Sequence, residues 1–284
     1  MSLTTRSRTI ARLQRGQETR DGDGVKLTRI IGTPMLPALD PFLMLDEFGS
    51  DEPTDYVGGF PDHPHRGFET VSYMLAGRMR HGDNHGHSGV LGPGSVQWMS
   101  AGRGIVHSEM PEQEEGLMWG FQLWVNLPAS DKMKPARYQE FAPESLPVIT
   151  AGEGVQVKII AGELQGVRGP IEGVATQPVY WDVTLAPGAR FTAPLPATHQ
   201  GFIYVFGGDL VAGPEDARKP VGRSWLGVLG EGEELELVAG TEGARLILVA
   251  GVPLNEPVAR YGPFVMNTQE EIQQAFVDYR EGRF

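Results

Sequence analysis

The chain has 284 residues, of which 40% are apolar, and its formal net charge is −12. This length suits one large or two ordinary domains, and the acidic balance disfavours direct binding to nucleic-acid phosphates or anionic lipid. The absence of cysteine excludes disulfides, thiolate metal sites and a cysteine nucleophile.

The sequence indicates neither a leader nor a membrane span. Residues 1–24 contain no apolar run typical of a signal peptide, and no stretch of about 20 apolar residues occurs anywhere in the chain. We therefore expect a cytoplasmic protein that does not bind membranes.

Alternating patterns predict strands throughout the first half of the chain. Four segments carry the pattern: 68–76, 95–100, 104–110 and 118–127. Sequences rich in glycine, asparagine and proline lie between them and indicate turns or loops. The connector that follows, residues 128–147, contains four prolines and little strand pattern, so we expect a domain boundary there.

The second half repeats this style. Its strand-like segments, broken at glycine or proline, are 155–164, 178–194, 201–213 and 234–253. The sequences APGA (186–189) and GTEGA (240–244) are typical of hairpin turns. Many short strands at even spacing predict a sandwich or barrel in each half, and the similar halves suggest a duplicated β-barrel.

A single helix is predicted at the end of the chain. Thr268 and Glu271 have the spacing of a capping box, and Ile272, Ala275 and Phe276 fall on one face of the following segment. We expect this amphipathic helix to pack on a barrel.

Six of the seven histidines lie in the segment from His63 to His107, and such clustering indicates a chemical role for them. Residues i and i+2 of a strand point to the same side, so His63 and His65 form one pair and His107 and Glu109 another. If the two strands are neighbours, three imidazoles and one carboxylate can meet around a transition metal. The alternative is that strand histidines are packed or solvated without a metal.

The remaining candidates are weaker. His85 and His87 have the same spacing but lie in a glycine-rich segment, and we expect them, with His81, to be solvated loop residues. Glu69 has the strand parity to face inward, as a ligand, as a hydrogen-bond acceptor for a ligand imidazole, or as an ion-pair partner of Arg66. His199 stands alone in the second half, where no metal site is visible.

Two long segments, HPHRGFETVSYMLAGRMRHGD and GVLGPGSVQWMSAGRGIVHSEMP, resemble the pirin family of the cupin superfamily. LDPFLMLDEF and GPFVMNTQEEIQQAFVDY resemble it as well, so the likeness covers nearly the whole chain. The resemblance implies an all-β bicupin of two stacked antiparallel β-barrels of the jelly-roll type, with a C-terminal helix. It places a metal-binding cupin domain at residues 1–135 and a second cupin domain without metal, ending in the helix, at residues 136–284.

The resemblance also implies one divalent metal, usually Fe²⁺, with Mn, Co, Ni, Cu or Zn as alternatives. The pirin ligands map onto His63, His65, His107 and Glu109. Bacterial relatives are associated with quercetin 2,3-dioxygenase activity, in which a flavonol-like aromatic enol and O2 are the substrates and the carboxylate of Glu109 would act as the catalytic base. Phe42, Met44, Phe68, Met99 and Phe121 are candidates for the pocket walls, although core packing is the expected role of most.

Two other functions fit the same site. Eukaryotic pirins act as transcription co-regulators, so the chain can instead be a redox-responsive protein that binds a regulatory protein partner through a surface near the metal. A non-redox isomerase or lyase is a further alternative, because cupin sites also perform Lewis-acid chemistry.

Overall fold

The computed structural model describes residues 6–284, which form two compact units of antiparallel sheet. The first unit combines Gln17–Pro143 with Leu254–Phe284, and the second combines the described part of Met1–Gly16 with Glu144–Pro253. Each unit is therefore built from two separate stretches of chain, unlike the continuous ranges 1–135 and 136–284, whose assignment as domains stays a prediction.

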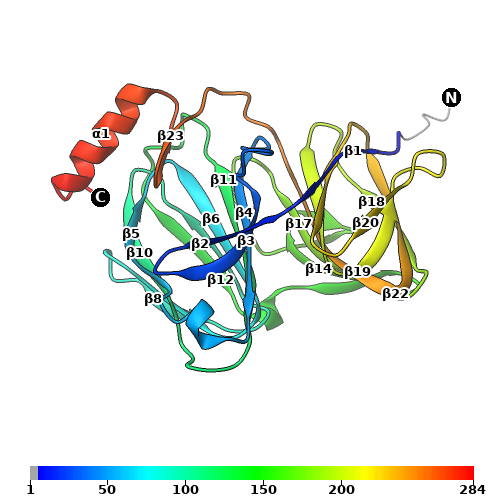
Figure 1. Cartoon of the computed structure of the whole chain (residues 1–284). Coiled ribbons are helices and arrows are strands. Elements are labelled where there is room, and N and C mark those ends of the chain that lie inside the picture. Colours follow the sequence, from blue (N-terminus) through cyan, green and yellow to red (C-terminus); the bar gives the residue numbers. More distant parts are fainter. Residues whose placement is uncertain (1–5) are drawn as a thin grey trace. The chain divides into compact units, whose positions relative to one another are not determined.

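The first unit contains a seven-stranded and a four-stranded sheet (Figure 1). The order of the larger sheet is β12 (Arg137–Phe141), β9 (Val96–Ser100), β6 (Phe68–Ala76), β11 (Met118–Asn126), β4 (Phe42–Ser50), β3 (Val25–Ile31) and β2 (Gln17–Asp21). The order of the smaller sheet is β5 (Phe60–His65), β10 (Ile105–Pro111), β7 (Met79–Asp83) and β8 (Ser88–Leu91). Short 3-10 turns occupy Pro53–Asp55 and Pro143–Ser145.

A hydrophobic core fills the space between these two sheets. Its buried members come from both, and they are Leu27, Phe48, Tyr56, Met74, Met79, Leu91 and Met118. Alternation places these side chains on the inner faces, which gives the jelly-roll arrangement expected of a cupin barrel.

The C-terminal segment completes the first unit. The hairpin of β23 (Ala259–Tyr261) and β24 (Phe264–Met266) leads into α1 (Gln269–Arg280), and the three elements pack together (Figure 1). The predicted capping box is confirmed, because Thr268 Oγ1 accepts from the Glu271 backbone N–H and the Glu271 carboxylate accepts from the Thr268 N–H. Ile272 and Ala275 are buried against Phe264, as the amphipathic pattern predicts.

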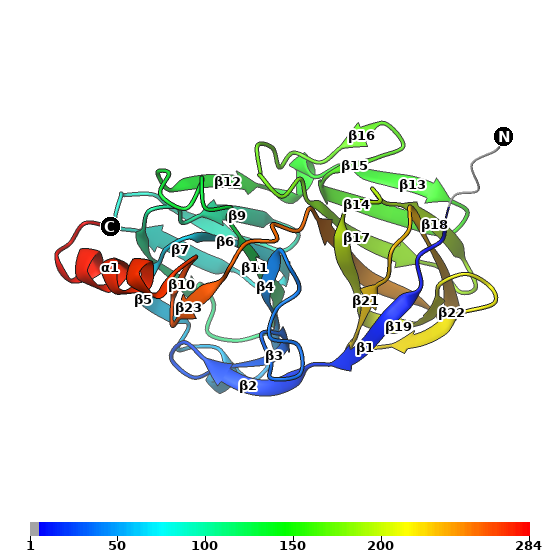
Figure 2. The ribbon, with the colours of Figure 1, turned by 90° about the horizontal axis from the view of Figure 1, so that it is seen from above.

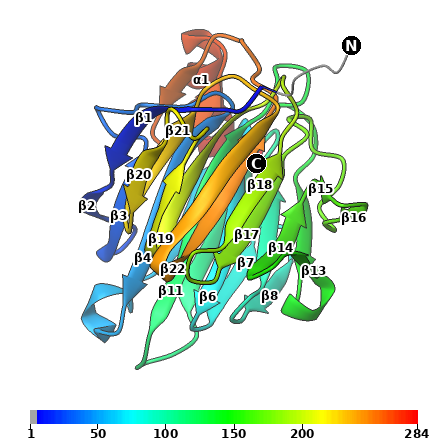
Figure 3. The same cartoon turned by 90° about the vertical axis from the view of Figure 1, so that its right-hand side faces the viewer.

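The second unit is built around one nine-stranded sheet (Figures 2 and 3). The main path is β1 (Ile10–Arg15), β21 (Trp225–Leu229), β19 (Gln200–Ala212), β22 (Glu234–Gly251), β17 (Val179–Leu185), β14 (Val155–Ala161) and β13 (Val148–Gly152). In addition, β18 (Arg190–Pro194) pairs with β22, β20 (Lys219–Gly222) pairs with β19, and β15 (Glu163–Leu164) pairs with β16 (Val167–Arg168). The long strands β19 and β22 pair over most of their length and carry the centre of a large apolar core.

Both hairpin turns predicted in the second half are wrong. GTEGA lies inside the continuous strand β22, where Gly243 has a φ of 77° and the pairing with β19 shifts register nearby. Glycine here supports a bulge that bends the strand instead of reversing it. APGA does form a turn, but it joins β17 to β18, which pair with different parts of β22 and not with each other.

Across the described residues, no helix is long and apolar enough to cross a lipid bilayer. Residues 1–5 lie outside the described part of the chain. They belong to the segment 1–24, in which the sequence predicts no signal peptide.

Candidate metal centre

Three histidines meet where β5 lies against β10. The strands are antiparallel, and the Cα atom of His107 pairs directly with that of His63. One nitrogen from each of His63, His65 and His107 lies within 4.8 Å of the others. The ring centroid of His63 lies 4.6 Å from that of His65 and 4.4 Å from that of His107. Among residues 6–284, this is the single such group of three or more metal-binding side chains.

The hydrogen bonding of these rings suits a metal ligand. The Nδ1–H of His63 donates to the Pro61 carbonyl at 2.8 Å, which leaves the Nε2 lone pair free for a cation. That Nε2 lies only 3.0 Å from Nε2 of His65. Both ring nitrogens of His107 are buried without a hydrogen-bond partner among the described residues. Buried unpaired nitrogens are costly, and a metal bound in this cluster would satisfy one of the two.

The protonation state also fits. Burial lowers the pKa of His65 well below its usual value, and it lowers the pKa of His107 to about 4. Both rings are therefore neutral near pH 7, which is the form that binds metals. Neutral imidazoles can hold Fe, Mn, Co, Ni, Cu or Zn.

Glu109 lies on the same strand as His107, and its carboxylate has other partners. Oε1 accepts a hydrogen bond from Ser72 Oγ at 2.8 Å, and Oε2 accepts one from Gln122 Nε2 at 2.7 Å. Burial by itself raises the pKa of Glu109, but the adjoining imidazoles and these two hydrogen bonds lower it overall. The carboxylate is thus fixed beside the histidines, and its role as fourth ligand stays a prediction.

Glu69 does not face the histidines, so its expected inward direction is wrong. On β6, Ser72 bonds to Glu109 and the Phe68 ring lies 4.9 Å from His65, so the even-numbered side chains face the site. Glu69 faces the other way and lies opposite Ser100 of β9. The chain turns at Arg66–Gly67, between β5 and β6. The alternation of side chains along β5 therefore does not continue into β6, and Glu69 does not share the face of His65.

The expectation that His81 is a solvated loop residue is also wrong. His81 lies on β7, is buried, and its Nε2 is 2.7 Å from the Glu140 carboxylate. His85 and His87 are exposed in the turn after β7, as predicted, and the His87 ring contacts Asp83. In the second unit His199 is buried, and its Nε2–H donates to the Gln177 carbonyl.

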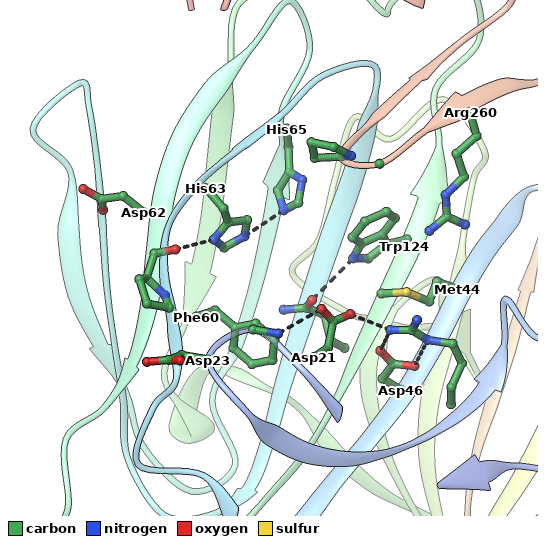
Figure 4. A pocket seen from close by; sticks show the side chains of 16 residues that line it. Asp21, Asp23, Met44, Asp46, Phe60, Asp62, His63, His65, Trp124 and Arg260 are labelled. Atoms are coloured by element: carbon green, nitrogen blue, oxygen red, sulfur yellow. Dashed lines mark hydrogen bonds and ion pairs between the residues drawn. The ribbon is translucent and has the colours of Figure 1, made fainter. Parts of the chain in front are cut away.

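A cavity of about 660 Å³ opens beside His63 and His65 (Figure 4). Asp23, Phe60 and Asp62 lie on the side of His63, and Met44, Asp46, Trp124 and Arg260 lie on the other side. Asp21 and Gln122 also line the cavity. Of the five apolar wall candidates only Met44 lines this cavity, and the other four are buried. All of these residues belong to the first unit.

The sequence did not single out most residues of this cavity, among them Gln122, Trp124 and Arg260. Gln122 and Trp124 lie two apart on a segment correctly predicted as a strand, so their shared face was available as a signal. Arg260 had no comparable signal, because it comes from the C-terminal hairpin and reaches the cavity only through tertiary structure.

Comparison with known proteins decides the family. The sequence profile of the pirin family, described as Pirin, matches residues 24–125, and that of the Pirin C-terminal cupin domain matches residues 180–284. The chain belongs to the pirin family. It is 51% identical to the "Pirin-like protein" of Caulobacter vibrioides, over 98% of this chain and 99% of that protein.

Two further relatives connect this pirin fold to a named activity. The chain is 50% identical to a Pseudomonas aeruginosa protein named "Putative quercetin 2,3-dioxygenase", over 98% of both chains. A crystal structure titled quercetin 2,3-dioxygenase from Acinetobacter baumannii superposes with a TM-score of 0.89 and 32% identity, covering 98% of this chain and 99% of that one. This pirin is therefore a cupin protein with a histidine cluster that could bind a metal.

Proposed function

We propose that this pirin is a metal-dependent dioxygenase of the quercetin 2,3-dioxygenase type, which opens a flavonol-like ring with O2. The observation that carries the proposal is the meeting of three histidines at one end of a cavity with an aromatic wall. The names of the relatives support the same activity.

In this proposal His63, His65, His107 and Glu109 hold one divalent ion, with Fe²⁺ as the first candidate. The bound ion would supply Lewis acidity toward the substrate hydroxyl and redox chemistry toward O2. Pro61 fixes the tautomer of His63 through its carbonyl, and burial keeps His65 and His107 uncharged.

Glu109 is proposed as the base. A flavonol must lose its 3-hydroxyl proton before the enol ring can react with O2, and a carboxylate oxygen beside the histidines can accept that proton. Ser72 and Gln122 hold the two carboxylate oxygens in place by hydrogen bonds, so little reorganisation is needed. In the overall reaction the central ring opens, dioxygen is incorporated and carbon monoxide leaves.

The cavity walls have a positioning role in this scheme. The Trp124 indole lies 5.2 Å from the His65 ring, and Met44 and Phe60 add apolar surface nearby. A planar aromatic substrate can pack on these groups, which excludes water from the reacting end.

The test is an assay of the protein loaded separately with Fe, Mn, Co, Ni and Cu and mixed with quercetin under air. We expect loss of the flavonol absorbance with release of carbon monoxide, and we expect Glu109→Gln to remove turnover. His85→Ala, which changes an exposed histidine, is the control and should remain active. An active Glu109→Gln enzyme would deny Glu109 the role of base.

The regulatory alternative has one supporting observation. His63 is only half-buried and lines an accessible cavity, so a change in metal charge would be felt close to the surface. Stoichiometric metal binding without turnover for any of the five metals would favour this redox-responsive binding protein over the enzyme.

A further inference from the structure

On the side of the cavity away from Asp62, the guanidinium of Arg260 lies over the indole of Trp124 (Figure 4). We propose that Arg260 determines substrate specificity by binding an oxyanion, a carboxylate or an ionised phenol, on a planar aromatic ligand whose opposite end reaches the histidines. The inference rests on the proposed function, because it names the class of substrate for the same site.

Arg260 lines this cavity near Asp46 and Asp21 but makes no direct contact with either carboxylate. Its Cζ lies 4.8 Å from the centroid of the Trp124 ring, and its hydrogen bond to the Leu43 carbonyl is long at 3.4 Å. Within residues 6–284 it forms no ion pair, and its side chain remains exposed along the cavity.

The neighbouring Arg29 of the same cavity, in contrast, has carboxylate partners for its N–H donors. Its Nε and Nη2 donate to the two oxygens of Asp46 at 2.9 and 2.8 Å, and Nη2 also donates to Asp21 at 2.8 Å. The Nε and Nη2 donors of Arg29 are therefore engaged by carboxylates of the protein, whereas the donors of Arg260 remain available to a ligand.

The position of the Arg260 guanidinium over the Trp124 ring favours a planar anion. Packing of a guanidinium on an aromatic face uses its π surface and leaves its in-plane N–H groups free to donate. Those donors form a rigid fork that matches the two oxygens of a carboxylate. Trp124 also holds the side chain in one position, which reduces the entropy lost when a ligand binds.

The cavity is electrically asymmetric, which sets the direction of the ligand. Asp23 and Asp62 are exposed at the side near His63, and Arg260 lies at the other side (Figure 4). The carboxylates of Asp21 and Asp46, which also line the cavity, are both paired with Arg29. An anionic substituent would be repelled at the acidic side and attracted at the basic one. The indole of Trp124 lies between, 5.2 Å from His65 and 4.8 Å from Arg260, so a ligand touching both must extend across it.

A matched pair of ligands tests this inference by equilibrium binding. The probes are 3-hydroxyflavone carrying a 4′-carboxylate and its neutral 4′-carboxamide, titrated calorimetrically into the metal-loaded full chain. We expect the wild-type protein to bind the carboxylate about tenfold more tightly than the carboxamide, the range of a charge-assisted hydrogen bond.

Arg260→Gln should remove this preference and leave carboxamide affinity within about twofold, whereas Arg260→Lys should keep part of it. Arg280→Gln, which changes an exposed arginine on α1, is the matched control and should behave as wild type. Thermal unfolding checks that each variant folds.

The inference is overturned if the wild-type protein shows no preference, if it binds neither ligand, or if the preference survives Arg260→Gln because the carboxylate binds elsewhere. Turnover of 3-hydroxyflavone in the same samples separates the two proposals. A preference lost in Arg260→Gln without any turnover supports this binding role and rejects the dioxygenase, and turnover without a preference does the reverse.

Discussion

His63 and His107 are direct cross-strand partners of β5 and β10, and their ring centroids lie 4.4 Å apart. Residues paired in this way have adjacent side chains on one face of a sheet. The pairing brings together two histidines that are far apart in the sequence, and His65 joins them by alternation along β5.

The first prediction concerns the metal ligands. His65→Ala or His107→Ala should reduce bound metal from about one ion per chain to background, because each removes a ring from the cluster. Elemental analysis of purified protein measures this, with His85→Ala as the control. Loss of metal in His85→Ala together with retention in His107→Ala would show that the ligand choice is wrong.

The second prediction is a pH dependence caused by Glu69. Burial raises its pKa from the usual 4.5 to about 7, so the folded protein binds a proton that the unfolded chain has released between these values. The contribution of Glu69 is therefore most favourable below pH 4.5 and is lost as the pH rises through 7.

The variant Glu69→Gln cannot ionise, so its free energy of unfolding relative to wild type should increase from pH 4.5 to pH 8 by up to about 3 kcal/mol. Urea unfolding of chelator-treated protein at several pH values measures the difference. The exposed Glu114→Gln provides the control. A difference that is constant with pH would contradict the raised pKa.

The third prediction concerns the support of Glu109. Gln122→Leu removes the hydrogen bond to Oε2 and leaves that buried oxygen without its donor. We expect the metal-free protein to lose about 1–3 kcal/mol of stability, the cost of an unsatisfied buried polar group. Urea unfolding measures it, and Gln273→Leu on the exposed face of α1 should change stability far less.

The fourth prediction concerns the attachment of α1. The buried Arg66 guanidinium donates to Asp278 at 2.6 Å and stacks on the Phe284 ring, and Asp278 also accepts from Gln274 and Arg283. Asp278→Ala leaves a buried cation unpaired and should cost about 3 kcal/mol in unfolding free energy. Glu270→Ala, on the exposed first turn, is the comparison. An equal effect of both changes would refute the importance of the pair.

Local rules predicted much of this structure. The segment 68–76 matches β6, and the capping box of α1 was readable from Thr268 and Glu271, because alternation and capping depend on neighbours in sequence. Strand parity placed His63 and His65 on one face, and the pairing of β5 with β10 brings His107 beside them.

Most of the failures have one physical cause: pairing between residues far apart in the sequence overrides local signals. GTEGA has the composition of a turn, yet its pairing partner β19 makes it a bulge within β22. His81 is buried because Glu140 of β12 lies against it. Glu69 faces away from the histidines because the chain turns between β5 and β6. No rule based on sequence spacing could have connected Arg260 to Trp124.

The two-part construction of the first unit has a consequence during synthesis. Residues 254–284 are synthesised after residues 17–143 of the same unit, and they supply Arg260 to the cavity and Asp278 to the buried Arg66 beside His65. A nascent or prematurely terminated chain thus carries all three histidines but neither of these groups. The histidine cluster can therefore be in place before the residues that complete the wall of its cavity are synthesised.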